Sequence, residues 1–189
     1  VQEAHAALLA LARRLDDPRL VALCALHLKE FDLAVSDANK CIELKADWAK
    51  GYDVVVHNEC FANTVDEGYI RSITHAHKEG VPAVVIHCAM HSYRASKTDD
   101  WRQFLGVTSR HHEHQSRYPV KKVALKHPIL KDMPEDWVTP KDELYVIEKM
   151  WPKARALATS KSERDGKEYA VAWTNQYGKA RVFGTTYGH

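Results

Sequence analysis

Two short apolar runs, each followed at once by polar side chains, dominate the hydrophobic pattern of this chain. The first covers residues 52–56 and the second residues 83–86, and both are rich in β-branched residues. Such runs, bounded by glycine or proline, predict strands that are buried on both faces of a sheet. Strands of this kind are typical of parallel sheets in α/β proteins, where ligands bind just beyond the carboxyl ends of the strands.

The segment between these two runs predicts a helix. Asp66 is a typical N-cap residue and Gly80 a typical terminator, so the helix is expected over residues 67–78. A strand–helix–strand order implies parallel neighbours joined by a right-handed crossover. The polar residues that follow the two strands, residues 57–60 and 87–94, should therefore meet at one edge of the sheet.

The C-terminal half predicts a short helix and a series of strands. The helix is expected over residues 99–105, before Gly106, and a histidine-rich loop over residues 109–117. Apolar or alternating segments predict strands over residues 120–125, 145–149, 155–159, 169–173 and 180–186.

The N-terminal residues have a different pattern. Residues 2–15 and 19–29 are rich in alanine and leucine and predict two helices joined by an Asp-Pro turn. Residues 20–52 also loosely match a single tetratricopeptide unit, and residues 31–36 fit a short strand. We expect a helical segment over residues 1–30 and one α/β domain over residues 31–189, a three-layer α/β/α sandwich with a mostly parallel sheet.

Composition and charge narrow the classes of protein. The chain has 45% hydrophobic and 28% charged residues, as in ordinary globular proteins, and a net charge of +2. Its lysines and arginines are scattered and not interleaved with aromatic residues, so no nucleic-acid partner is expected. No segment approaches the ~20 apolar residues of a membrane span. No secretion signal is visible, so we expect no membrane partner and take a cytoplasmic location as the default.

The four cysteines, Cys24, Cys41, Cys60 and Cys88, are far apart and include no CxxC pair. This spacing fits neither a disulfide framework nor a zinc ribbon, so reduced thiols are expected. The twelve histidines stand out more, because histidine is the usual metal ligand and proton-transfer residue near neutral pH.

Several stretches, taken in order, resemble the ThuA-like (trehalose utilisation) family, which has the flavodoxin-like, class I glutamine amidotransferase-like fold. The resemblance covers about residues 43–189, and the shared order of the stretches is more specific than any one of them. It is carried by residues 47–60, residues 81–94, Asp100-Trp101, His127-Pro128-Ile129, Asp142-Glu143-Leu144-Tyr145 and residues 173–189. Residues 1–30 depart from the family, and the chain stops at His189 where the family usually continues, so we expect a domain truncated at both ends.

The resemblance implies a catalytic centre at the end of the second apolar run. His87 stands at the position of the amidotransferase nucleophile, and His189 falls near the partner histidine. Imidazole is a poor replacement for a thiolate in amide hydrolysis, and Cys88 comes one residue late, so glutaminase activity is not expected. The candidate catalytic residues are therefore His87, His189 and Glu143.

A metal site is a further hypothesis for the same histidines. His87 and His91 are four residues apart, which places them on one face of a helical turn, and His112 and His114 follow later in the chain. Imidazoles and a carboxylate can bind Zn²⁺ or a similar ion such as Mn²⁺, or share acid–base work on a polar substrate. An exposed loop without ligands is the alternative for His112 and His114.

The candidate substrate-binding residues are His57, Asn58, Tyr93, Arg94 and Trp173. Aromatic rings offer flat surfaces to a sugar, and a guanidinium binds anionic groups. His57 is equally well explained as a hydrogen-bonded core histidine, and Trp173 as a core residue.

The resemblance implies a role in the catabolism of trehalose or a related keto-sugar, with a small carbohydrate as substrate. The class of enzyme stays open among hydrolase, lyase and isomerase. A non-catalytic carbohydrate-binding or interaction module on the same fold is the alternative, and a helical adaptor acting through residues 1–45 ranks last. Association of the chain with further copies of itself also stays open.

Overall fold

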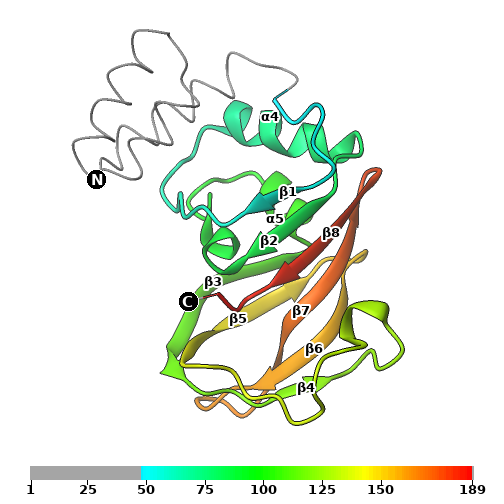
Figure 1. Cartoon of the computed structure of the whole chain (residues 1–189). Helices are drawn as coiled ribbons and strands as arrows, with labels where there is room; N and C mark the ends of the chain where they lie inside the picture. The colour runs from blue at the N-terminus through cyan, green and yellow to red at the C-terminus, as the bar shows by residue number, and fades with distance from the viewer. Residues whose placement is uncertain (1–47, 189) are drawn as a thin grey trace, which may run out of the picture. The chain divides into compact units, whose positions relative to one another are not determined.

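The strand–helix–strand unit predicted near the centre of the chain is present in the computed structural model, which describes residues 48–188 (Figure 1). It comprises β1 (Val55–His57), α4 (Glu67–Lys78) and β2 (Ala83–Ile86). The Asp66 side chain accepts a hydrogen bond from the backbone N–H of Tyr69 and caps α4. The bounds of α4 and β2 are those predicted, whereas β1 begins three residues later than residue 52.

The main sheet has six strands in the order β1-β2-β8-β7-β6-β4. Its remaining members are β4 (Val120–Lys122), β6 (Arg155–Lys161), β7 (Glu168–Tyr177) and β8 (Ala180–Thr185). β1–β2 and β2–β8 are parallel, but the other three pairings are antiparallel. The prediction of a mostly parallel sheet is therefore wrong for the described residues, because β6, β7 and β8 are joined by turns too short for a parallel crossover.

A second, two-stranded sheet pairs β3 (Val107–Ser116) with β5 (Asp142–Met150) in antiparallel fashion. The loop predicted over residues 109–117 is thus mostly strand. Its alternation is hidden by three register irregularities and by exposed histidines at positions 111, 112 and 114. The pairing sets His112 opposite Tyr145, and so fixes where the histidine-rich segment lies.

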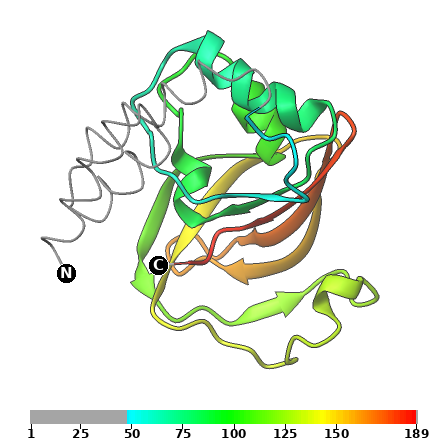
Figure 2. The ribbon, with the colours of Figure 1, turned by 45° about the horizontal axis from the view of Figure 1, so that its top comes forward.

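The helices cover one face of the main sheet. α4 and α5 (Asp100–Leu105) pack against each other, and α5 also contacts β7 and β8 (Figure 2). α5 ends at Gly106, whose φ of 84° is the left-handed conformation typical of a helix terminator. Two short 3₁₀ helices complete the described elements, η1 (His87–His91) and η2 (Pro128–Leu130).

The core between helices and sheet is aromatic. Trp101, Phe104 and Trp173 are at most 1% exposed, and the Trp173 indole N–H donates to the Leu105 carbonyl at 2.8 Å. Gly184 lies against the Trp173 ring, where a Cβ would overlap the ring atoms. These contacts fix α5 on the sheet and hold the adjoining strand ends in place.

Residues 51–188 belong to one compact unit. The predictions of a helical segment over residues 1–30, of a domain boundary at residue 31 and of a strand over residues 31–36 lie outside the described residues. The third layer of the predicted sandwich stays a prediction. Within the described part of the chain, no helix is long and apolar enough to cross a membrane.

Candidate functional site

A pocket of about 460 Å³ lies at the carboxyl ends of β1 and β2. The polar residues that follow the two strands meet there, and β3 and β5 add residues from the second sheet. The lining consists of Asn58, Cys60, His87, Cys88, His91, Arg94, His112, Glu143, Tyr145 and Gly188. Five predicted site residues besides His87 are thus brought together around it: Asn58, His91, Arg94, His112 and Glu143.

His87 occupies the sharp turn between β2 and η1. Its φ is +44°, in the left-handed region that residues other than glycine seldom adopt, at a cost of about 1–3 kcal/mol. The ring is 5% exposed, and Nδ1 lies 2.8 Å from the Thr186 carbonyl oxygen. Because a carbonyl only accepts, Nδ1 carries the proton, and Nε2 is the ring nitrogen that gains or loses one.

Two adjacent carboxylates at the start of β5 flank the His87 ring. Asp142 Oδ1 lies 3.8 Å from Nδ1, and Glu143 Oε2 lies 3.7 Å from Nε2. Asp142 is itself held by the backbone N–H groups of Glu143 and Gly188, at 2.7 and 3.1 Å. This arrangement stabilises a positive charge that develops on the imidazole.

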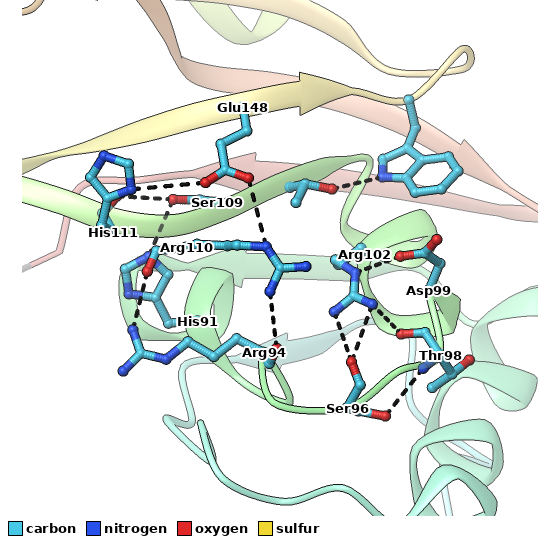
Figure 3. A network of polar contacts seen from close by, with 12 residues as sticks. His91, Arg94, Ser96, Thr98, Asp99, Arg102, Ser109, Arg110, His111 and Glu148 are labelled. Carbon is cyan, nitrogen blue, oxygen red and sulfur yellow. Dashed lines mark hydrogen bonds and ion pairs between the residues drawn. The ribbon is translucent and has the colours of Figure 1, made fainter.

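His91 lies beside His87 and is buried in the same pocket wall. The Ser109 hydroxyl donates to the His111 carbonyl at 3.2 Å, so it accepts from His91 Nε2, also at 3.2 Å (Figure 3). Burial, assisted by the positive charge of Arg94, lowers the pKa of His91 to about 4. His91 is therefore neutral at pH 7.

His112 completes the group of imidazoles. Its Nδ1 donates to the Glu113 carbonyl at 2.8 Å and lies 3.6 Å from Glu143 Oε2. Its ring is stacked with that of His91 at 5.8 Å, and both rings pack on Tyr145. Glu143 thus stands between His87 and His112 and can serve either imidazole.

Arg94 is exposed at the edge of the pocket. Its guanidinium donates to the Arg110 carbonyl at 3.3 Å, and the Arg110 guanidinium donates to the Arg94 carbonyl at the same distance (Figure 3). Arg110 also lies 3.7 Å from Glu148 Oε2. These contacts tie Arg94 to β3 and keep its charge near the pocket.

The structure does not bring the other predicted site residues to the pocket. Trp173 is fully buried, and Tyr93 is 1% exposed and packs against Trp101 at 4.9 Å, so both are core residues. His114 is exposed and forms an ion pair with Glu163 at 2.9 Å. These positions do not support Tyr93 and Trp173 as substrate-binding residues or His114 as a metal ligand. His189 lies outside the described residues.

His57 belongs to a buried polar chain behind the pocket. Its Nδ1 lies 2.9 Å from Glu59 Oε1 and its Nε2 lies 2.9 Å from His77 Nε2, while His77 Nδ1 lies 2.7 Å from the Val81 carbonyl oxygen. Both ring nitrogens of His57 are thus engaged by protein groups, and the residue is 6% exposed, so His57 is a core residue rather than a substrate ligand.

The residues do not form a ligand set for a metal. Among residues 48–188, no three His, Cys, Asp or Glu side chains are arranged to hold an ion. Three of the four predicted ligands line the pocket, namely His87, His91 and His112. One ring N–H of each, however, donates a hydrogen bond to a protein oxygen. Binding of Zn²⁺ or Mn²⁺ stays a prediction that needs a further ligand, such as His189, and no chemical step is derived from it.

Sequence reasoning missed the groups that orient His87. The Thr186 carbonyl and Gly188 N–H are backbone groups, which no side-chain pattern reveals. Asp142 contributes to the family resemblance but is not among the predicted site residues, although two adjacent carboxylates at the start of an apolar strand are a usable signal. Tyr145, which packs against both His87 and His91, was assigned only to a strand.

The chain matches the family model described as ThuA, trehalose utilisation, over residues 2–189. A search of curated proteins finds no match.

Solved structures show the same fold at low sequence identity. A ThuA-like protein from Parabacteroides merdae has a TM-score of 0.62 at 22% identity, over 73% of this chain and 60% of that one. A ThuA-like protein from Bacteroides uniformis has a TM-score of 0.65 at 16% identity, over 78% and 64%. A cytoplasmic protein from Salmonella typhimurium has a TM-score of 0.56 at 14% identity, over 75% and 62%. The chain thus covers less than two thirds of the length of each neighbour.

Proposed function

Because this chain belongs to the ThuA family (trehalose utilisation), we propose that it binds a sugar or keto-sugar in the His87 pocket and processes it by general acid–base catalysis. The observation that carries the proposal is the state of His87. Its backbone is strained, and the hydrogen bond from Nδ1 to the Thr186 carbonyl fixes its tautomer. Strained residues of this kind cluster at functional sites.

His87 acts as the base and then as the acid. In the neutral ring, Nε2 accepts a proton from a hydroxyl or from a carbon next to a carbonyl, and the imidazolium that forms is stabilised by Glu143 at 3.7 Å. Returning this proton to another atom of the same substrate gives an isomerisation, whereas returning it to a leaving group gives an elimination. Positioned acid–base groups of this type contribute about 10²–10⁴-fold to a rate.

The other lining residues bind and orient the substrate. Asn58 and Arg94 supply amide and guanidinium donors for sugar hydroxyl or carbonyl oxygens, and His112 presents Nε2 as an acceptor, since its Nδ1 donates to Glu113. The volume of about 460 Å³ lies within the range of small-molecule sites, about 300–1,000 Å³. A small carbohydrate therefore fits the pocket in both size and polarity.

The location and state of assembly extend the proposal. We include a cytoplasmic location in the proposal, since the Salmonella typhimurium neighbour is named as a cytoplasmic protein. Light scattering of the purified chain measures whether it forms homo-oligomers.

Proton exchange tests the proposal directly. Trehalose, glucose and keto derivatives of glucose are incubated with the protein in D₂O, and carbon-bound deuterium is followed by NMR. The wild type should exchange the proton next to the carbonyl of a keto-sugar, and His87→Gln should lose at least about 10²-fold of that rate. His114→Gln, which changes an exposed histidine outside the pocket, is the matched control and should exchange as the wild type does.

Binding measured by calorimetry separates the remaining outcomes. Binding without exchange or turnover, weakened by Arg94→Ala, would instead establish the carbohydrate-binding module. A wild type that neither binds nor exchanges any of these sugars, in a chain shown to be folded, would refute the proposal.

A further inference from the structure

Two cysteines line the His87 pocket, each in the segment that follows one of two neighbouring strands. Cys60 is the third residue after β1, and Cys88 is the second after β2, within η1. The parallel pairing of β1 with β2 brings these two segments to the same edge of the sheet.

Hydrogen bonds fix the segment of Cys60 to the end of η1. The Ser92 hydroxyl donates to the Glu59 carbonyl at 2.6 Å and accepts from the Phe61 N–H at 3.0 Å. The Tyr93 N–H donates to the Phe61 carbonyl at 2.9 Å. Both residues next to Cys60 are therefore tied to the segment that follows Cys88.

The two thiols lie close enough to influence each other. Besides burial, Cys60 is among the groups that raise the pKa of the Cys88 thiol, and Tyr145 acts in the opposite direction. Cys60 is exposed, whereas Cys88 is half-buried. This combination places a solvent-accessible thiol beside a protected one.

We propose that Cys60 and Cys88 form a reversible intramolecular disulfide across the mouth of the pocket. Low-molecular-weight disulfides such as oxidised glutathione are the oxidant. The proposal goes beyond the proposed function, and only the effect of the disulfide on sugar binding rests on it.

The reaction proceeds by two thiol–disulfide exchanges. The Cys60 thiolate attacks one sulfur of the oxidant, forms a mixed disulfide and releases one reduced thiol. Cys88 then loses its proton to solvent, attacks the Cys60 sulfur and releases the second thiol. Two protein thiols are oxidised, and one small disulfide is reduced to two thiols. A thiol reductant such as dithiothreitol reverses the process through two exchanges in the opposite direction.

The second exchange should be the slow one at neutral pH. Burial, assisted by the neighbouring Cys60, raises the pKa of Cys88 to about 11, so little of it is thiolate at pH 7. Ring closure should therefore accelerate as the pH rises.

Mass spectrometry of the whole chain tests the proposal. The other two cysteines are replaced in a Cys24→Ser/Cys41→Ser background, so that only one intramolecular pair can form. After exposure to oxidised glutathione, the protein should lose the mass of two hydrogen atoms. Trypsin cleaves after Lys50, Arg71, Lys78 and Arg94, so a non-reduced digest should contain the peptide 51–71 linked to the peptide 79–94.

Single variants in the same background identify the order of events. Cys88→Ser should stop at a glutathione adduct on Cys60, and Cys60→Ser should react more slowly than Cys88→Ser because its remaining thiol is half-buried. The proposal is overturned if the oxidised background protein carries only glutathione adducts or intermolecular disulfides.

Sugar binding is measured separately on the reduced and oxidised forms. A loss of affinity on oxidation, restored by dithiothreitol, shows that the disulfide controls the pocket. Failure of the sugar assay with the linked peptide present would count against the proposed function and leave the disulfide established.

Discussion

Acidification should destabilise this protein well before its carboxylates are protonated, because two histidines are buried in the neutral form. His77 is fully buried and His91 is 5% exposed. Burial lowers the pKa of each to about 4 from the usual 6.5. In the unfolded chain both regain the usual value, so between pH 6.5 and pH 4 the unfolded state binds more protons and stability falls as the pH falls.

The size of the effect follows from these values. Relative to pH 7, a histidine whose pKa changes from about 4 in the folded state to 6.5 in the unfolded state lowers the free energy of unfolding at pH 5 by about 2 kcal/mol. His77 and His91 together give about 4 kcal/mol, a large part of the 5–15 kcal/mol typical of a domain. Glu59 contributes little to the change in stability between pH 7 and pH 5. Burial raises its pKa, but the nearby His57 has the opposite effect, and the net result is a pKa lowered from the usual 4.5.

Urea unfolding at pH 7 and pH 5, at equal ionic strength, measures the difference. For a slope of about 2 kcal/mol per M, the midpoint should fall by about 2 M. His91→Gln removes one of the two buried imidazoles and should halve the shift. His75→Gln changes an exposed histidine on α4 and should leave the shift as in the wild type.

Equal midpoints at pH 7 and pH 5 in the wild type would refute the reasoning. The reasoning would also be refuted if neither His91→Gln nor His77→Gln reduced the fall in the urea midpoint between pH 7 and pH 5. His77→Gln carries the greater risk of not folding, because it breaks the hydrogen-bonded chain with Val81 and His57, so His91→Gln is the primary variant.

Three further variants test the packing and the support of the site. Gly184→Ala should lower stability by about 3 kcal/mol in thermal unfolding, because its methyl group would overlap the Trp173 ring. Gly166→Ala, at a φ of +72° with no close neighbour, should cost only about 1 kcal/mol, and an equal loss in both variants would contradict the overlap. Asp142→Asn cannot accept both backbone N–H groups through two oxygens, so it should lower sugar turnover more than stability, and unchanged turnover would exclude Asp142 from positioning His87.

Local signals predicted the elements that local physics determines. Asp66 and Gly80 gave α4 its predicted bounds, and the apolar run at residues 83–86 became β2. The predicted direction of strand pairing was wrong, because direction depends on the length of the connection and not on the apolar pattern. For example, β7 and β8 are joined by a tight turn at Gly178 and must be antiparallel. The strand at residues 107–116 was missed because its polar face and irregular register leave no clean period of two.

The sequence predicted which side chains belong to the candidate site better than it predicted how they are arranged. A strand-end position singled out His87, and six of the predicted residues line one pocket. Burial in the core separates Tyr93 and Trp173 from the pocket, since aromatic residues fit a core as well as a sugar platform. Backbone partners such as the Thr186 carbonyl carry no sequence signal at all.

The turn at His87 links the two proposals physically. Cys88 follows His87 directly, so a bond from Cys88 to Cys60 would restrain the same strained backbone that presents His87 to the pocket. Tyr145 lies beside both residues, with its ring against that of His87 and its hydroxyl near the Cys88 thiol. Oxidation of the cysteines should therefore change access to His87, and sugar turnover should differ between partly oxidised and fully reduced protein.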